Sequence, residues 1–332
     1  MKPIIIAEGG VNHNGSLATA LKLVDTAARA GADYVKFQTF KSDKLVTDKG
    51  KTADYQKANT NTESQIDMLR RLELPYDSFK IIADHCKEKG IGFLSTPFDM
   101  ESIDFLSSLQ MDYFKIPSGE ITNLPYLRKI ASMKVPVIIS TGMSTLADVE
   151  NALQVMYDGG MSRYDITLLH CNTQYPTHFS DVNLRAMITL RDAFGVNVGY
   201  SDHTPGIVVP VAAVALGATV IEKHFTLDKS MDGPDHIASL SPDELEDMVR
   251  GVRHVSMALG SPIKRVTYSE KKNITAARKS IVAAKKIKKG EIFSEENITV
   301  KRPGNGLSPM LWDMVIGHAA TKSYLPDEPI EL

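Results

Sequence analysis

Lysine, serine, glutamate and histidine side chains follow eight short apolar runs within the first 225 residues of the chain. They are Glu8, Lys36 with Gln38, Thr96, Lys115 with Ser118 and Glu120, Ser140, Asn172 with Tyr175, Ser201 with His203, and His224. Ammonium groups and hydroxyls suit a phosphate or a carboxylate. Because buried charges are costly unless they are paired, so many together predict a site for a charged ligand.

His203 and His224 end consecutive runs. If those runs are neighbouring parallel strands, both imidazoles can reach one metal ion. Two imidazoles completed by oxygen ligands suit Mn²⁺, Fe²⁺, Co²⁺ or Zn²⁺. The lysines have a second use, since a desolvated lysine can form a Schiff base with a carbonyl substrate. The residues alone leave both chemistries open.

The elements that must position these residues alternate regularly. The apolar runs are Pro3–Gly9, Tyr34–Phe40, Gly92–Phe98, Tyr113–Glu120, Pro136–Gly142, Ile166–Cys171, Asn197–His203 and Thr219–Phe225. Helical patterns between and after them include Leu17–Ala30, Pro75–Lys89, Leu146–Tyr157, Ile207–Leu216 and Pro242–Leu259. Eight alternating units predict a (β/α)8 TIM barrel, in which the carboxyl ends of the strands carry the active site.

The composition changes after the eighth unit. The segment from Pro262 to Arg302 contains twelve Lys and Arg and four Glu, so its net charge is +8. The whole chain has a net charge of −2, so the rest of it carries −10. We expect a barrel domain over 1–262, a polar linker over 263–275 and a small β-rich domain over 276–332. Arg302 opens a Gly-rich turn there, and its planar guanidinium could lie against a substrate amide or carboxylate.

Charge and composition exclude several classes of protein. The sequence pI near 6.5 argues against a nucleic-acid partner, although the +8 segment leaves that alternative to be tested. No apolar stretch reaches the ~18 residues of a membrane span, so no membrane partner is expected. Two cysteines suit a reducing compartment, and we expect a cytoplasmic protein.

Ten motifs resemble the N-acetylneuraminate (sialic acid) synthases and their legionaminic and pseudaminic acid relatives. They are IAEGGVNHNG, VKFQTF, LSTPFD, FKIPSGE, IISTGM, LLHCNTQYPT, GYSDHT, IEKHFTLD, GPDH and VKRPGNG, in the family's order. The resemblance implies condensation of phosphoenolpyruvate with an N-acyl hexosamine to give a nonulosonic acid and phosphate. It also implies a homodimer in which a C-terminal SAF (antifreeze-like) domain covers the partner's active site.

The resemblance carries roles onto matching positions of this sequence. The metal ligands are His203 and His224, with Mn²⁺ the usual ion and Mg²⁺ or Co²⁺ as alternatives. The phosphoenolpyruvate ligands are Lys36, Thr96, Lys115, Ser118, Ser140 and Ser201. The sugar ligands are Gln38, Tyr175, Asp235 and Arg302, and the acids beside the reacting carbons are Glu8 and Glu120.

Several points stay open at this stage. The order Asn172-Thr173 is reversed in some relatives, and either Asn59 or Asn61 could be the asparagine near the sugar. The motif PSGE indicates the sialic and legionaminic branch, but leaves N-acetylmannosamine and 2,4-diacetamido-trideoxymannose as alternative sugars. The competing functions are a class I Schiff-base aldolase or lyase and a non-catalytic carbohydrate-binding protein.

Overall fold

The computed structural model describes residues 2–60 and 62–332. It divides the chain into two compact units, of which the first ends at Gly260 and the second spans Ser261–Leu332. Helix α12 (Tyr268–Ala277) occupies much of the stretch predicted as a linker. The side chain of Thr267, just before this helix, accepts a hydrogen bond from the Glu270 backbone N–H, which explains why the helix begins there.

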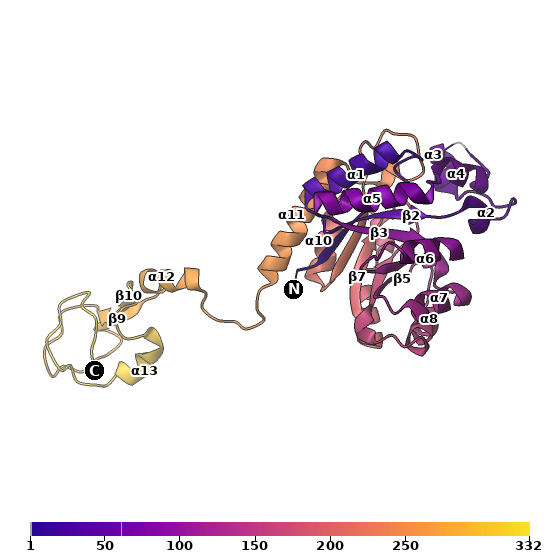
Figure 1. Cartoon of the computed structure of the whole chain (residues 1–332). Helices are drawn as coiled ribbons and strands as arrows, with labels where there is room; N and C mark the ends of the chain where they lie inside the picture. The colour runs from indigo at the N-terminus through magenta and orange to yellow at the C-terminus, as the bar shows by residue number, and fades with distance from the viewer. Residues whose placement is uncertain (1, 61) are drawn as a thin grey trace. The chain divides into compact units, whose positions relative to one another are not determined.

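Eight parallel strands form the centre of the first unit (Figure 1). They are β1 (Ile4–Gly10), β2 (Tyr34–Thr39), β3 (Gly92–Pro97), β4 (Phe114–Ile116), β5 (Val137–Ser140), β6 (Ile166–Cys171), β7 (Asn197–Asp202) and β8 (Val220–His224). Their hydrogen-bonded order is β3-β2-β1-β8-β7-β6-β5-β4. Strands β3 and β4 end this order and have Cα atoms within 8 Å of each other, which brings the sheet round into a barrel.

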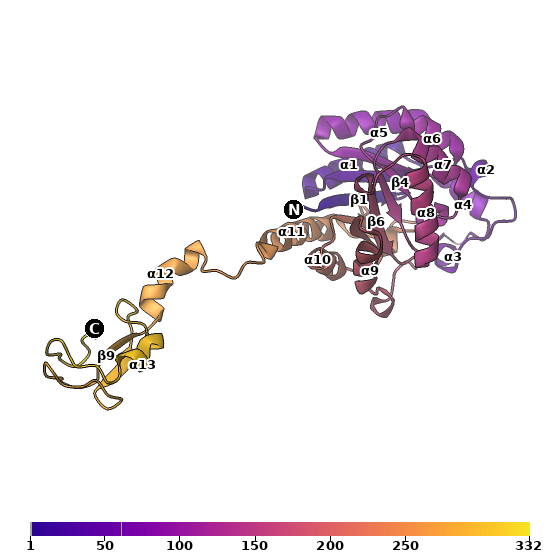
Figure 2. The ribbon, with the colours of Figure 1, turned by 90° about the horizontal axis from the view of Figure 1, so that it is seen from below.

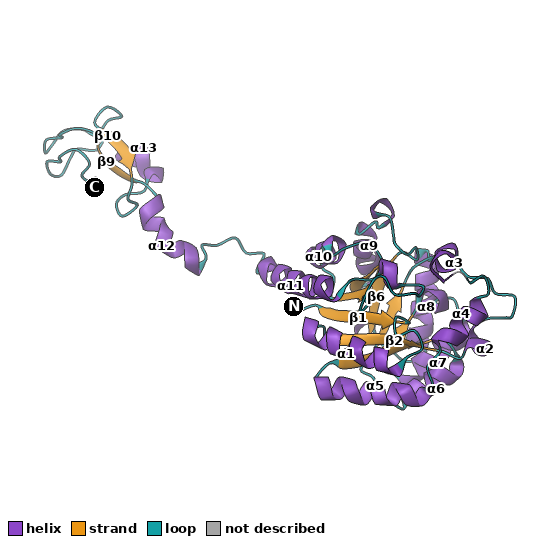
Figure 3. Cartoon of the chain, turned by 90° about the horizontal axis from the view of Figure 1, so that it is seen from above, coloured by secondary structure: helices purple, strands orange, loops and turns teal. Residues whose placement is uncertain are grey.

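Helices surround the strands, as the purple and orange ribbons in Figure 3 show. After the successive strands come α1 (Leu17–Ala30), α5 (Tyr76–Lys89), α6 (Met100–Ser107), α7 (Leu124–Met133), α8 (Leu146–Asp158), α9 (Arg185–Phe194), α10 (Val208–Ala215) and α11 (Pro242–Leu259). Between β2 and α5 the chain inserts α2 (Ser42–Leu45), α3 (Asp54–Thr60) and α4 (Gln65–Leu72). The first unit is the predicted TIM barrel with one helical insertion.

Local sequence explains where these elements end. The α1 helix begins at Ser16, whose side chain accepts from Thr19 N, and ends at Gly31, whose φ of 80° lies in the left-handed region. The run predicted as a strand over Tyr113–Glu120 is shorter in the structure, because Pro117 has no N–H to continue the ladder. A short 3₁₀ turn follows it at Ser118–Glu120.

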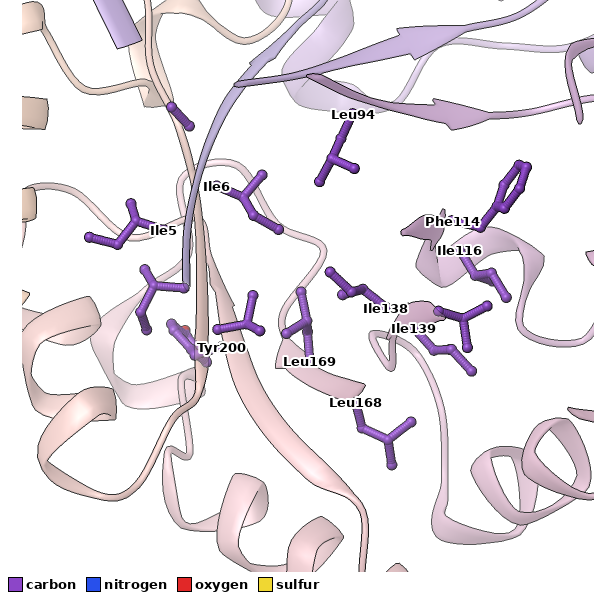
Figure 4. Close-up of a cluster of buried hydrophobic side chains, with 14 of the residues drawn as sticks. Ile5, Ile6, Leu94, Phe114, Ile116, Ile138, Ile139, Leu168, Leu169 and Tyr200 are labelled. Atoms are coloured by element: carbon purple, nitrogen blue, oxygen red, sulfur yellow. The ribbon is translucent and has the colours of Figure 1, made fainter. Parts of the chain in front are cut away.

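An apolar layer lies directly below the polar strand ends. Ile6, Leu94, Ile138 and Leu169 each precede a polar or cysteine residue by two positions, and all four are buried. Since side chains of a strand alternate between two faces, both members of such a pair point the same way. Figure 4 shows these four side chains around a common space. The barrel interior is therefore filled, and only its upper layer can hold a ligand.

An ion pair on the outward face of β7 and β8 joins these strands. Lys223 Nζ lies 2.5 Å from Asp202 Oδ2, and both side chains are fully buried. We expect Lys223→Met to lower the free energy of unfolding by about 3–5 kcal/mol, because Asp202 would stay buried without its cation. Urea denaturation measures this. Lys229→Met is the control, since the Lys229–Glu244 pair is about 40% exposed; equal losses in both variants would contradict the argument.

The second unit is small and has its own core. Strands β9 (Ser280–Ala283) and β10 (Ile298–Lys301) pair antiparallel, and helix α13 spans Trp312–Val315. Ile281, Phe293 and Tyr324 are among the apolar residues buried within it. Across both units, no helix in the described part of the chain has the length and apolarity needed to cross a bilayer.

Candidate active site

The carboxyl ends of the barrel strands surround an open cavity, here called the first cavity. Eleven residues predicted for the site line it: Glu8, Lys36, Gln38, Thr96, Lys115, Ser118, Ser140, Tyr175, Ser201, His203 and His224. Glu120 and Asp235 line a neighbouring cavity instead. The structure thus brings together side chains from all eight strands and the loops that follow them.

Four buried charges form the floor of the first cavity, and we call them the ion cluster. Lys36 Nζ contacts Glu8 and lies 3.7 Å from Glu222 Oε2. Lys115 Nζ lies 3.7 Å from Glu222 Oε1. The strand register explains the contact, since Glu8 pairs with Lys36 between β1 and β2. Two ammonium groups are thereby held next to each other, with both carboxylates offsetting their repulsion.

The two carboxyls of the ion cluster, Glu8 and Glu222, have pKa values shifted in opposite directions. Burial raises the pKa of Glu8 to about 7, although Lys36 opposes the shift. Burial also acts on Glu222, but Lys115 and Lys36 outweigh it and lower the pKa of this carboxyl. Burial lowers the pKa of Lys115, whereas Glu222 and Glu8 outweigh burial and raise that of Lys36. Glu8 is therefore the member best suited to exchange a proton near neutral pH.

Glu222 is a site residue that the sequence interpretation missed. It is 5% exposed, accepts a hydrogen bond from Ser201 Oγ at 2.9 Å, and lines the first cavity. A signal was present, because Glu222 precedes His224 by two positions and must share its face of β8. The β1–β8 register pairs Glu8 with His224, so it places Glu222 in the ion cluster with Glu8 and His224 next to that cluster.

Hydroxyl groups surround the two ammonium groups. Lys36 Nζ donates to Thr96 Oγ1 at 3.0 Å, and Lys115 Nζ donates to Ser140 Oγ at 2.6 Å. Ser118 Oγ accepts from Gly142 N at 3.0 Å. A Cβ added at Gly142 would lie 2.8 Å from that hydroxyl, so this close approach requires glycine. The result is a basic, hydroxyl-lined cavity that suits an anion carrying phosphate and carboxylate groups.

The two predicted metal ligands face one space. The ring centres of His203 and His224 are 5.5 Å apart. Imidazole nitrogens bound about 2.1 Å from one ion have ring centres roughly 4.5–6.5 Å apart, so the separation fits a shared ion. Among the residues that the structure describes, no group of three or more His, Cys, Asp or Glu could hold a metal.

Protonation also fits metal binding at this pair. Nδ1 of His203 donates to the carbonyl of Asn172 at 2.5 Å, which leaves Nε2 with its lone pair. Burial lowers the pKa of His203 to about 4 and that of His224 well below its usual value, so both rings are neutral. Nδ1 of His224 is buried without a hydrogen-bond partner in the described chain. Neutral, partly unsatisfied imidazoles are the form that coordinates a cation.

A second cavity adjoins the first and shares five of its wall residues: Gln38, Phe98, Gly119, Tyr175 and His224. Glu120 and Asp235 belong to the second cavity. Glu120 accepts from Asn123 Nδ2 at 2.6 Å. Burial raises the pKa of Asp235 to about 6. The two predicted acids, Glu8 and Glu120, thus lie in different cavities.

The open asparagine questions are partly answered. Asn59 Nδ2 donates to the carbonyl of Pro234 at 2.7 Å, so it supports the loop that carries Asp235. Asn61 lies outside the described residues. Thr173 lines the first cavity, whereas the side chain of Asn172 accepts from Gln174 N at 2.8 Å. Thr173 is therefore the member of its pair that the structure brings to the cavity.

Arg302 lies in the second unit. Its side chain is exposed, and Nε donates to the carbonyl of Ala277 at 3.0 Å. This hydrogen bond uses one edge of the guanidinium, and the other nitrogens remain available as donors.

The fold and the site define a TIM-barrel enzyme whose strand ends suit an anionic substrate. The NeuB family matches residues 23–264, and the SAF domain matches residues 278–332. The chain belongs to the NeuB family and carries a C-terminal SAF domain. The predicted family, the barrel and the SAF domain are thus confirmed.

Full-length relatives support the assignment. N,N'-diacetyllegionaminic acid synthase of Campylobacter jejuni is 56% identical over 330 residues, which cover 99% of both chains. The enzyme of the same name from Legionella pneumophila is 47% identical, over 96% of this chain and 90% of its own. The crystal structure of N-acetylneuraminic acid synthetase from Leptospira borgpetersenii in complex with citrate has a TM-score of 0.73 at 32% identity, covering 82% of this chain and 90% of that one.

Proposed function

We propose that the chain condenses phosphoenolpyruvate with 2,4-diacetamido-2,4,6-trideoxymannose in a divalent-metal-dependent reaction, giving N,N'-diacetyllegionaminic acid and phosphate. The observation that carries the proposal is the buried pair of lysines, Lys36 and Lys115, in the first cavity. That cavity adjoins the second cavity, which is large enough for an amino sugar. The 56% identical relative, named as a diacetyllegionaminic acid synthase, supports the choice of sugar.

The ion cluster and its hydroxyls would bind phosphoenolpyruvate. Lys36 and Lys115 offer ammonium groups to its phosphate and carboxylate, and Thr96 and Ser140 orient them through the hydrogen bonds described above. Ser118 and Ser201 add hydroxyls to the same wall. Holding both anionic groups fixes the enol carbon relative to the second cavity, and such positioning supplies a large part of a rate enhancement.

His203 and His224 would hold the cation, for which we propose Mn²⁺. A divalent cation bound there acts as a Lewis acid that draws charge from a sugar carbonyl. The protein prepares the site by keeping both rings neutral and by orienting His203 through the Asn172 carbonyl.

In the proposed reaction, carbon 3 of phosphoenolpyruvate forms a bond to the aldehyde carbon of the open-chain sugar. The carbonyl electron pair moves onto the aldehyde oxygen, which takes a proton from water, and positive charge is left at carbon 2. Water adds to carbon 2 and gives its proton to Glu8, whose pKa of about 7 allows it to act as a base near neutrality. The hydroxyl now on carbon 2 passes its remaining proton to the leaving phosphate as its carbon–oxygen double bond forms and the bond from carbon 2 to the phosphate oxygen breaks, which leaves a 2-keto acid and phosphate.

Glu8→Gln should lower kcat by about 10²- to 10⁴-fold, because it removes the base from the first cavity. Glu120→Gln should act mainly on the KM for the sugar, since Glu120 lines only the second cavity. Steady-state kinetics with each substrate varied in turn separates the two effects. Near-normal kcat in Glu8→Gln would show that another group is the base.

A substrate panel tests the whole proposal. Purified protein with Mn²⁺ and phosphoenolpyruvate is given N-acetylmannosamine, its 2,4-diacetamido-trideoxy analogue or no sugar, and phosphate release is recorded. We expect release only with sugar, most rapidly with the diacetamido compound. Phosphoenolpyruvate labelled with ¹⁸O at the bridging position should release labelled phosphate, because the carbon–oxygen bond breaks. Unlabelled phosphate, or no release with any sugar, would contradict the proposal.

The Schiff-base alternative needs its own test, because burial lowers the pKa of Lys115 and so favours the neutral amine that such a reaction requires. Borohydride with pyruvate would reduce and trap such an intermediate on lysine. We expect no covalent adduct, and we expect EDTA to abolish turnover. An adduct on Lys115 together with indifference to EDTA would select the aldolase reaction instead.

Both cysteines are free thiols, which suits the cytoplasm as the proposed compartment.

We further propose a homodimer in which Arg302 of one chain serves the active site of its partner. Arg302→Ala and Glu8→Gln chains should each be nearly inactive alone. A mixed dimer has one complete site of two, because the Arg302→Ala barrel receives an intact arginine from the Glu8→Gln chain. It should therefore recover about half of the wild-type activity, and a random 1:1 mixture about a quarter. Subunit exchange followed by phosphate release measures this. No recovery in verified mixed dimers would mean that Arg302 acts within its own chain or not at all.

A further inference from the structure

We infer that the helical insertion between β2 and α5 selects the sugar, through an apolar wall that recognises the 6-methyl and 4-acetamido groups of the substrate. This insertion wall consists of Leu45, Val46, Gln65, Met68, Leu69 and Leu72. The inference rests on the proposed function, and it assigns specificity to residues that have no part in the reaction at the strand ends.

The position of the wall follows from the two cavities. The aldehyde carbon of the sugar must lie beside phosphoenolpyruvate, and therefore in or next to the first cavity. The rest of the six-carbon chain then extends past the shared residues Gln38 and Tyr175 into the second cavity. Helices α2 and α4, which carry the insertion wall, line that second cavity and not the first. The wall is thus placed to contact the end of the sugar that differs between the two candidate substrates.

The wall is held in place by its own contacts. Figures 1 and 2 show α2 and α4 side by side. Glu73, just after α4, accepts from Ser42 N at 2.8 Å and from Ser42 Oγ at 2.7 Å, and Lys41 Nζ donates to it at 3.0 Å. Met68, Leu69 and Leu72 pack with Val11 and Phe40 in one apolar cluster. A wall fixed in this way can discriminate by shape and polarity rather than adapt to either sugar.

The chemistry of the wall favours the diacetamido sugar. N-acetylmannosamine has hydroxyls at carbons 4 and 6, which would lose water against leucine, valine and methionine side chains without gaining hydrogen bonds. A methyl group at carbon 6 and the methyl of a 4-acetamido group gain from the same burial.

Gln65 supplies a polar partner within this apolar wall. Its side-chain amide forms no hydrogen bond within the described chain, whereas Gln56, which lines the same cavity, uses Oε1 to accept from Ala53 N. A glutamine amide carries one acceptor and two donors, the complement of an acetamide group. Gln65 is therefore the residue that we assign to the 4-acetamido group.

Two conservative substitutions test the inference. Val46→Thr adds a hydroxyl to the wall at nearly constant volume, and Gln65→Leu removes the amide. For each variant, kcat/KM is measured with both sugars at saturating phosphoenolpyruvate and Mn²⁺. We expect wild type to prefer the diacetamido sugar by about a hundredfold or more. Val46→Thr should reduce this preference about tenfold, and Gln65→Leu by about 10- to 100-fold, while the KM for phosphoenolpyruvate stays within about twofold of wild type.

Matched substitutions away from the cavities provide the controls. Val208→Thr changes a valine on α10 that is 73% exposed, and Gln154→Leu changes a glutamine on α8 whose amide donates to Asp158. Both should leave the preference unchanged. Equal changes for both sugars in the wall variants, or a wild type that prefers N-acetylmannosamine, would overturn the inference while condensation stands. If wild type uses neither sugar, the proposed function itself fails, and the assignment fails with it.

Discussion

Lys115→Met should lower kcat/KM for phosphoenolpyruvate about a thousandfold, mostly through a higher KM. The Lys115 ammonium group lies between Ser140 and Glu222 at 2% exposure. Its removal leaves the Glu222 carboxylate facing the anionic substrate with Lys36 as its remaining cation. Truncating one member of a buried charge pair costs roughly 2–5 kcal/mol, and a thousandfold loss corresponds to about 4 kcal/mol.

The double variant Lys115→Met/Glu222→Gln distinguishes two effects of Lys115→Met: the lost attraction between the ammonium group and phosphoenolpyruvate, and the repulsion of phosphoenolpyruvate by the unpaired Glu222 carboxylate. It removes both charges, so it should bind phosphoenolpyruvate at least about tenfold more tightly than Lys115→Met alone. Lys80→Met, on the exposed surface of α5, is the control for a general effect of charge. Isothermal titration calorimetry with phosphoenolpyruvate, alongside kinetics, measures the series. A KM within a few-fold of wild type in Lys115→Met would remove this lysine from the binding site.

His203→Ala and His224→Ala should each reduce turnover to below about a thousandth of wild type. Each variant removes one of the two imidazoles whose rings lie 5.5 Å apart, and water alone would have to replace it as a ligand. Mn²⁺ binding, followed by electron paramagnetic resonance, should fall from one strong site per chain to none. This second readout does not depend on catalysis.

His85→Ala is the matched control for the histidine variants. His85 lies on α5, where its imidazole contacts Asp25 at 3.0 Å on the protein surface. Turnover and Mn²⁺ binding should both match wild type in this variant. If His203→Ala or His224→Ala keeps one strong Mn²⁺ site and EDTA-sensitive turnover, the cation is held elsewhere.

Many of the site residues could be predicted from the ends of the strands, because a strand's position and the alternation of its side chains depend on local sequence. In a parallel barrel every strand ends at the same edge, and alternate residues point inward, so Lys36, Thr96, Ser140 and His224 were predicted from their positions alone. The same rule applied to β8 would have included Glu222. Glu222 lies two positions before His224 on the same face of β8, inside the strand and not at its end.

The division of the site into two cavities could not be predicted in the same way. Glu120 follows β4 directly, yet the strand ends at Ile116 and a 3₁₀ turn carries Glu120 to the second cavity. The insertion wall is still less visible in sequence, since its leucines and methionine follow the ordinary pattern of a packed helix. Only the fold shows that their cluster also forms the side of a cavity.

The family, the barrel, the C-terminal SAF domain and the types of side chain at the strand ends are all legible in the amino-acid order. These depend on short-range patterns of polarity and on continuous sequence motifs. Three features required the folded chain: which carboxylate pairs with which lysine, which nitrogen of His203 keeps its lone pair, and which acid lies in which cavity. The β1–β2 and β1–β8 registers fix the ion cluster, the Asn172 carbonyl orients the His203 ring, and the 3₁₀ turn after β4 carries Glu120 to the second cavity. The first two join residues that are far apart in the chain, so they arise only on folding.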